Sequence, residues 1–398
     1  MELDMAATKG ALLEELVRAY FARQGFFVLR SVPYRFDGED VTDLDVWIYS
    51  RQAASARIRA VVDIKNKRSP KAFERILWVK GIQAALNCDR AIIATIDANP
   101  KVARFAQSQQ IQVLSKGFLE RLEKKLSRDD RLTLEEFSAA VQEYSAHKQD
   151  GDWLRIIGEA KSAVACMGGF PAFNRAMFAF RFFGERAEVR LQHRDIALRC
   201  ALQAAALACI ALDAGLERTV FEDGDRRFAS VIEGINYGDD GDGRVLSSVK
   251  SALSVLTEGL PNGRTIAAQV QQHFDKKITA IRADIVAEYF AREHNAQHLF
   301  AVAKELDEAA HARAWNTSEL SLEARSVLGV FADFVGIKRT VLPIASQKMS
   351  PSTTATAVAS PTPANAKPEE IQSAVDINSE TLVDPDLLRT TQDQKPLL

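Results

Sequence analysis

Two short stretches decide the fold of this chain, Val41-Thr-Asp-Leu-Asp-Val46 and Val61-Val-Asp-Ile-Lys65. Each alternates apolar and polar residues, which predicts a strand, and in a strand the side chains two residues apart share a face. In the first stretch we therefore expect Asp43 and Asp45 to point one way. The opposite, core-facing side is expected to hold Leu44, Val46 and Ile48.

The second stretch follows the same rule, with Asp63 and Lys65 on one face and Val62 and Ile64 on the other. If the two strands are neighbours, Asp45, Asp63 and Lys65 meet. Mg²⁺ prefers one or two carboxylates together with water and phosphate oxygens. A lysine beside such a metal can orient or help deprotonate water and offset negative charge in phosphodiester hydrolysis. A D-x-K tripeptide alone arises often by chance, so its surroundings decide its meaning.

The surrounding segments alternate helical and strand periodicity, which predicts an α/β domain with a mixed sheet flanked by helices. Residues 34–40 are expected to form a polar turn region. The final two strands stand where helical connections make parallel neighbours. We expect helices at 10–24, 71–87 and 100–109, and strands at 26–32, 41–49, 58–65, 91–96 and 111–114.

The order of these elements and their residues resembles the PD-(D/E)XK nuclease superfamily, specifically its Mrr-like restriction endonucleases, over residues 8–120. Glu14, one helix length before Gly25-Phe26, is similar to that family's first-helix pattern. Asp45-Val46 resembles its metal-binding acid, and Asp63-Ile64-Lys65 resembles its acid-x-Lys tripeptide. Two departures are that no proline precedes the strand acid and that the tripeptide begins with Asp rather than Glu.

The resemblance implies a metal-dependent endonuclease that cleaves DNA, with Mg²⁺, or alternatively Mn²⁺, as its cofactor. It implies Glu14, Asp45, Asp63 and Lys65 as catalytic residues, and a metal held by Asp45, Asp63 and Ile64. Glu14 is preferred over Glu15 because it borders the apolar stripe of the first helix, whereas Glu15 lies farther toward solvent. Asp43 is left open between an assisting and a solvent-facing role.

Basic residues gather around this set. Residues 51–90 contain ten Lys or Arg against three acids, although the whole chain carries a net charge of −2. Such a local excess of positive charge is plausible as a phosphate-facing surface. Lys67, Arg68 and Lys71 are the expected nucleic-acid-binding residues.

Strand signals end near residue 125, so we expect a nuclease domain at 1–125 and an all-helical domain of unknown role at 126–342. Thr133 with Glu136 forms a capping-box pattern at the first helix of that domain. Breaks between helices are expected at 167–171, 237–243 and 260–263. Residues 343–398 hold seven of the chain's 12 prolines and are expected to form a disordered tail.

Composition favours a cytoplasmic protein with no membrane span. Apolar residues make up 47% and charged residues 26% of the 398 residues, as in globular proteins. The amino terminus lacks the pattern of a signal peptide. The apolar run at 199–213 is shorter than the ~20 residues of a membrane span and predicts a buried helix. The scattered cysteines Cys88, Cys166, Cys200 and Cys209 predict thiols in a reducing compartment.

Three functional readings remain open at this stage. The first is an active DNA endonuclease, in restriction or antiphage defence. The second is an inactive nuclease-like fold that binds nucleic acid. The third is a helical protein-interaction scaffold that carries a nuclease effector. The complete set Glu14, Asp45, Asp63 and Lys65 favours the first over the second. Nothing in the sequence separates the first from the third, and a homodimer or a protein partner remains open.

Overall fold

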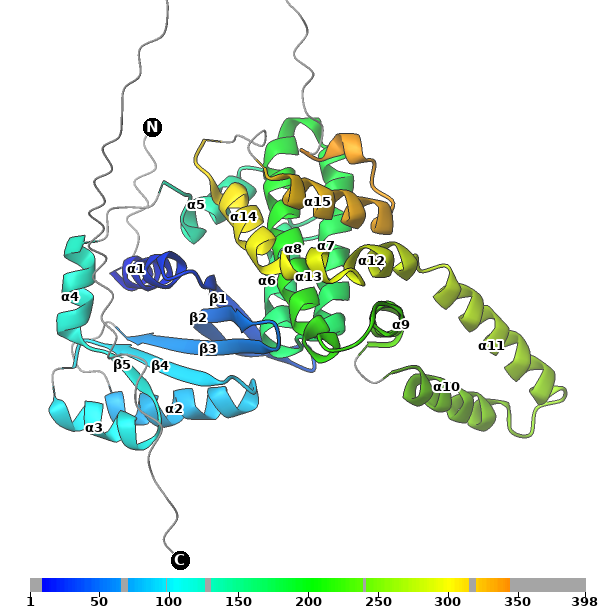
Figure 1. Ribbon diagram of the computed structural model, residues 1–398, viewed down its shortest axis with the longest axis horizontal. Coiled ribbons are helices and arrows are strands. Elements are labelled where there is room, and N and C mark those ends of the chain that lie inside the picture. Colours follow the sequence, from blue (N-terminus) through cyan, green and yellow to red (C-terminus); the bar gives the residue numbers. More distant parts are fainter. Residues whose placement is uncertain are drawn as a thin grey trace, which may run out of the picture. The chain divides into compact units, whose positions relative to one another are not determined.

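A mixed sheet at the start of the chain is followed by a long helical region in the computed structural model (Figure 1). The structure describes residues 9–65, 71–97, 99–125, 130–238, 241–314 and 320–343. The five strands lie in chain order, and the pairs β1–β2 and β2–β3 are antiparallel while β3–β4 and β4–β5 are parallel. Their bounds are β1 Phe27–Phe36, β2 Glu39–Ala53, β3 Ala56–Lys65, β4 Arg90–Thr95 and β5 Gln112–Leu114. The expected α/β arrangement and the parallel last pair are confirmed.

The first hairpin differs from expectation, because strands replace most of the polar turn expected at 34–40. Strand β1 runs on to Phe36 and β2 begins at Glu39, so that the turn is only Asp37-Gly38. These two residues have φ of 50° and 87°. A two-residue turn with positive φ at both positions strongly prefers Asp-Gly, which explains the tight connection.

One face of the sheet is covered by helices α1 (Lys9–Arg23) and α4 (Lys116–Lys125). The apolar stripe expected for the first helix is used here, since Val17 and Phe21 pack on the strands. The same core takes alternate residues of the strands and one leucine of α4: Val28, Val46, Ile48, Ala60, Val62, Ile64, Ile92, Ala94 and Leu119.

The other face is shared between two sets of helices. Helices α2 (Ala72–Ala85) and α3 (Pro100–Ser108) contact β3, β4 and β5, whereas α6 (Trp153–Cys166) contacts β1. Leu29, Trp47 and Tyr49 on this face belong to one continuous apolar core that extends into the helical region. All described residues lie in a single compact unit. The domain division at residue 125 stays a prediction.

The helical region is built around α8 (Arg194–Gly215), an alanine-rich helix that packs along α7 and α14. The segment Leu191–Thr219 is long and apolar enough to span a membrane, but 94% of its most apolar window is buried inside the molecule, as expected for a core helix. The remaining helices are α5 Leu134–Gln142, α7 Gly169–Val189, α9 Gly224–Tyr237, α10 Gly241–Thr257, α11 Gly263–Thr279, α12 Ala283–Phe290, α13 Glu293–Gln297, α14 Leu299–His311 and α15 Leu322–Val335.

Helix boundaries in this region follow the sequence signals. Thr133 and Glu136 form the expected capping box, in which each side chain accepts a hydrogen bond from the other residue's backbone amide. All three expected breaks separate helices: α6 from α7, α9 from α10, and α10 from α11. The expected tail lies outside the described residues from residue 344 onward.

Candidate active site

The sequence-predicted carboxylates lie where two strands part. Pairing between β2 and β3 ends at Val46 and Val62. Beyond that pair β2 continues along β1 alone, and β3 continues along β4 as far as the pair Lys65–Thr95. Asp45 and Asp63 are each one residue past the last β2–β3 pair. Both side chains therefore stand at the opening of a fork between strands.

The side chain of Asp45 points into this fork because the alternation of side chains between the two faces of β2 is interrupted at this residue. Leu44 packs in the core that contains Trp47, whereas Val46 packs in the core on the opposite face. The expectation that Leu44 and Val46 share a face is therefore wrong. Strand β1 is irregular opposite this point, since Ser31 has φ of 46° and lies between two regular pairs with β2. Such a local irregularity re-aims a side chain.

The carboxylate of Asp45 turns toward β3 and takes the place of a backbone hydrogen bond between β2 and β3 beyond their last pair. Its Oδ2 accepts a hydrogen bond from the backbone amide of Ile64 at 2.6 Å. The expected faces of β3 are confirmed, because Val62 and Ile64 pack in the core under α1 while Asp63 points to the other side, toward α2.

Lys65 joins the two carboxylates. Its Nζ lies 3.6 Å from Oδ2 of Asp45 and 3.5 Å from Oδ1 of Asp63. The side chain of Asp63 is 1% exposed, compared with 18% for Asp45 and 28% for Lys65. The structure thus brings together the three strand residues that the sequence selected, and Lys65 is the one nearest to solvent.

Burial raises the pKa of Asp45 to about 6, and the negative charges of Asp63 and Glu14 act in the same direction. The amide of Ile64 and the ammonium of Lys65 oppose the rise by stabilising the charged form. A buried carboxylate with a raised pKa, beside a second acid and a lysine, is a typical arrangement of functional sites.

Arg75 of α2 compensates the charge of Asp63 from the other side. Its Nε donates to Oδ2 of Asp63 at 3.1 Å, and its second guanidinium nitrogen contacts Oδ1. The guanidinium also stacks on Trp78, with its central carbon 3.9 Å from the ring centroid. No sequence signal distinguishes Arg75 from the other nine basic residues between residues 51 and 90.

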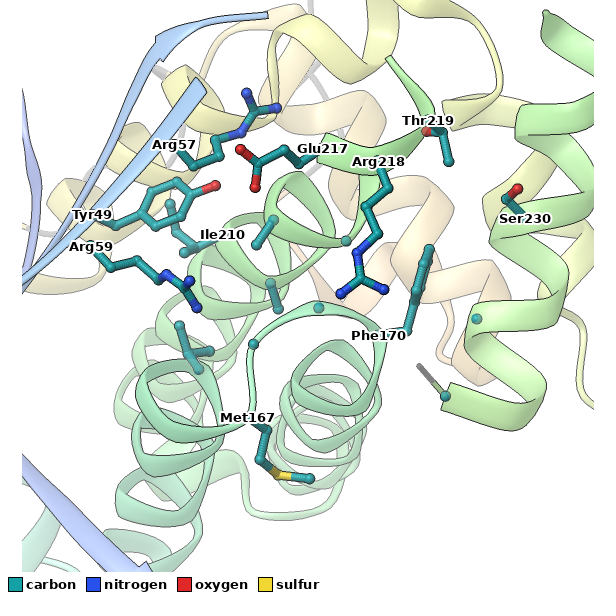
Figure 2. Close-up of a pocket in the computed structure, with 18 of the residues that line it drawn as sticks. Tyr49, Arg57, Arg59, Met167, Phe170, Ile210, Glu217, Arg218, Thr219 and Ser230 are labelled. Atoms are coloured by element: carbon teal, nitrogen blue, oxygen red, sulfur yellow. The ribbon is translucent and has the colours of Figure 1, made fainter. Parts of the chain in front are cut away.

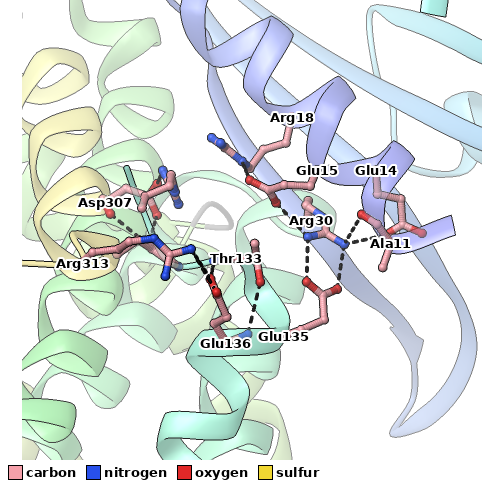
Figure 3. Close-up of polar contacts among 12 residues, drawn as sticks. Ala11, Glu14, Glu15, Arg18, Arg30, Thr133, Glu135, Glu136, Asp307 and Arg313 are labelled. Carbon is pink, nitrogen blue, oxygen red and sulfur yellow. Dashed lines mark hydrogen bonds and ion pairs between the residues drawn. The ribbon is translucent and has the colours of Figure 1, made fainter. Parts of the chain in front are cut away.

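Glu14 lies near the fork, but among the described residues it makes no hydrogen bond or ion pair with Asp45 or Asp63. Its carboxylate accepts a hydrogen bond at 3.1 Å from Arg30, a buried arginine of β1. Arg30 also contacts Glu15 of α1 at 2.8 Å and Glu135 of α5 at 2.9 Å (Figure 3). This arginine holds α1, β1 and α5 together. A charged residue inside the apolar run of β1 was the signal that could have revealed it.

The donors at the fork fit a hard divalent cation. Asp45 and Asp63 offer carboxylate oxygens, and Ile64 offers its backbone carbonyl oxygen, while its amide donates to Asp45. Within the described ranges, no group of three or more His, Cys, Asp or Glu side chains is placed to hold a metal. The candidate set therefore depends on two carboxylates with backbone and solvent oxygens, which is the pattern typical of Mg²⁺.

The structure describes one of the three residues that we expect to contact DNA. Lys67 and Arg68 lie outside the described residues. Lys71 directly precedes α2, and its side chain is 75% exposed and lies 3.1 Å from Glu74. Lys71 is thus exposed and ion-paired at the start of the helix that carries Arg75, and its contact with DNA stays a prediction.

Comparisons with protein-family models, with curated proteins and with solved structures find no match to this chain. The arrangement of Asp45, Asp63 and Lys65 at the fork is therefore the main indication of function.

Proposed function

We propose that this chain is a metal-dependent endonuclease that hydrolyses DNA phosphodiester bonds, with a site of the PD-(D/E)XK kind. One observation carries the proposal: Lys65 lies within 3.6 Å of Asp45 and 3.5 Å of Asp63 at the fork between β2 and β3. The mixed sheet, with α1 on one face and α2 on the other, agrees with the resemblance noted in the sequence.

Each residue of the fork has a separate task in this proposal. Asp45, Asp63 and the carbonyl of Ile64 would hold Mg²⁺ or Mn²⁺, which supplies Lewis-acid activation of a phosphate oxygen and of water. Lys65, the most exposed of the three contacting side chains, orients the attacking water and offsets charge that develops on the phosphate. Glu14, held by Arg30, contributes negative charge behind the site.

DNA is the proposed substrate because of the basic residues that follow Lys65 in the chain. Arg75 and Lys71 lie on or directly before α2, and Lys67 and Arg68 precede them in the chain. Cations placed in this way neutralise phosphates and position a nucleic-acid backbone without reading its sequence.

The second candidate is an inactive module that only binds nucleic acid. The contacts of Lys65 with both carboxylates favour catalysis, because a binding surface for DNA gains nothing from two buried acids. A role in restriction or antiphage defence, and a cytoplasmic location suited to the buried thiols of Cys88, Cys200 and Cys209, belong to the same proposal.

The proposal is tested by incubating the full chain with supercoiled plasmid, linear duplex and branched DNA, in EDTA, Mg²⁺ or Mn²⁺. We expect cleavage of at least one DNA form with a divalent metal and none in EDTA. DNA binding without cleavage in either metal would support the inactive module. Cleavage that persists in EDTA would contradict the metal site.

A further inference from the structure

A second cavity lies on the same sheet face as Asp63, away from the fork. Its volume is about 300 Å³ (Figure 2). Tyr49 of β2 and Arg59 of β3 are paired in the sheet and line it from one side. Arg59 is four residues before Asp63, which at the rise of a strand is roughly 13 Å away. The helical region lines the other side, so the cavity is separate from the candidate active site.

Three arginines line this cavity, Arg57, Arg59 and Arg218; Arg59 is half-buried and Arg218 is exposed. Arg59 comes from β3, and Arg218 comes from the 3-10 helix η2 (Leu216–Thr219). Figure 2 shows both guanidinium groups directed toward the turn that precedes α7. Among the described residues, neither guanidinium has a hydrogen-bond or ion-pair partner. Arg57, two residues before Arg59, instead lies 2.7 Å from the buried carboxylate of Asp213.

This difference between neighbouring arginines indicates an anion site. Arg57, which has a structural role, is paired with a buried acid of the protein, Asp213. Arg59 and Arg218 line one cavity and, in the part of the chain that the structure describes, neither is paired with an acid, so an anion bound between them would accept hydrogen bonds from both guanidinium groups.

The floor of the cavity between the two arginines is open backbone. Gly168 and Gly169 have φ of 66° and 54°, a conformation that residues with side chains rarely adopt. A Cβ added at Gly168 would lie 3.9 Å from a terminal nitrogen of Arg59. Helix α7 starts at Gly169 without a side-chain cap, which adds partial positive charge to the same place.

Three glutamates, Glu217, Glu222 and Glu233, occupy other parts of the cavity wall. Glu217 points toward Tyr49 and Arg57 (Figure 2). Glu222 accepts a hydrogen bond from the hydroxyl of Ser230 at 3.3 Å. A ligand whose phosphate lies at the glycine turn could therefore present hydroxyl or amino groups to these acids.

We propose that this cavity binds a small phosphorylated molecule, with its phosphate between Arg59 and Arg218 over the turn at Gly168. The volume of about 300 Å³ is at the lower end of the range for small-molecule pockets. This excludes a duplex and suits a nucleoside phosphate or a sugar phosphate. The site lies between the sheet and helices α7, α8 and α9, and its function is additional to DNA cleavage.

The test measures binding by calorimetry, with inorganic phosphate, AMP, ATP and glucose 6-phosphate as separate probes. We expect at least one organic phosphate to bind more tightly than inorganic phosphate. Replacing either arginine, as Arg59→Gln or Arg218→Gln, should weaken binding by roughly 10-fold or more, because a charge-assisted hydrogen bond is lost. Arg104→Gln, an exposed arginine of α3, serves as the matched control and should bind as the wild type does.

Thermal unfolding without ligand checks that each variant is folded. Asp63→Asn should retain binding, which separates this site from the proposed nuclease site. The proposal is overturned if no probe binds at about 1 mM, or if a variant that combines Arg59→Gln with Arg218→Gln binds as the wild type does. It is also overturned if the arginine variants weaken only the binding of duplex DNA.

Discussion

The guanidinium of Arg75 holds both carboxylate oxygens of Asp63, with Nε 3.1 Å from Oδ2. Asp63 is almost completely buried, so its charge needs a partner inside the protein. Lys65 supplies a second positive charge at 3.5 Å. A metal ligand that is already paired with an arginine binds its metal in competition with that arginine or beside it.

Replacing this partner gives the first prediction. We expect Arg75→Ala to lower the free energy of unfolding in EDTA by about 2–3 kcal/mol, because a buried carboxylate loses its bidentate partner. Mg²⁺ should stabilise this variant more than the wild type, since a divalent cation restores the lost positive charge. Urea unfolding with and without Mg²⁺ measures both effects, with Arg104→Ala as control. Equal stabilisation of variant and wild type by Mg²⁺ would place the metal elsewhere.

The buried lysine of α6 gives a prediction about pH. Lys161 donates to the backbone carbonyl of Arg30 at 3.4 Å, and burial lowers its pKa to about 8. Asp307 raises this pKa, whereas Arg30 and Arg131 lower it further. The charged form is therefore disfavoured in the folded state relative to the unfolded chain.

Below pH 8 the free-energy cost of charging Lys161 in the folded protein is fully present. It is relieved as the pH rises toward 10.5, the pKa of lysine in the unfolded chain. We expect Lys161→Met to raise the free energy of unfolding at pH 7 by up to about 3 kcal/mol. The difference in free energy of unfolding between the variant and the wild type should shrink between pH 8 and 10. Lys101→Met, at an exposed position of α3, provides the control for general titration. A difference that stays constant up to pH 10 would show that the pKa of Lys161 is not lowered in the folded protein.

The junction between sheet and helices gives a stability prediction. Asp213 of α8 accepts hydrogen bonds from the hydroxyl of Tyr49 at 2.7 Å and from Arg51 at 2.9 Å, and it pairs with Arg57. Asp213→Ala should destabilise the protein by about 3–5 kcal/mol, because two arginines then lose their buried partner. Tyr49→Phe should cost only about 1 kcal/mol. Urea unfolding measures both variants, and similar small losses would mean that the junction contributes little.

The basic residues that follow Lys65 in the chain give a prediction about DNA affinity. Changing Lys67, Arg68 and Lys71 together to Gln should weaken binding to a non-cleavable duplex. It should also reduce the slope of log affinity against log salt by roughly one unit for each lost phosphate contact. Fluorescence anisotropy across a salt series measures the slope. The same slope in variant and wild type would show that these side chains face away from DNA.

Much of the fold was predictable because its signals are local. Strand periodicity, the capping box at Thr133 and the Ala-rich run of α8 all depend on residues close in sequence. The hairpin at Asp37-Gly38 is also locally encoded, because Asp-Gly favours a two-residue turn, but the polar residues around it resemble a longer turn region.

The site was predictable in its residues but not in its geometry. Asp63 and Lys65 follow strand alternation, so their shared face could be deduced. The direction of Asp45 could not, because it depends on paired irregularities in β1 and β2 that no periodicity reveals. The ion pair of Arg75 with Asp63 joins a helix to a strand and depends on tertiary packing.

The central claim is that Asp63 and Lys65 are catalytic residues of a metal-dependent nuclease, and cleavage rates test it most directly. Plasmid cleavage in Mg²⁺ would be timed for the wild type, Asp63→Asn, Lys65→Ala and the control Asp40→Asn, whose side chain on the same strand as Asp45 is 76% exposed. Circular dichroism would confirm that each variant is folded. We expect rates reduced by roughly 100-fold or more in the two site variants and unchanged in the control. Wild-type rates in folded Asp63→Asn or Lys65→Ala would contradict the account.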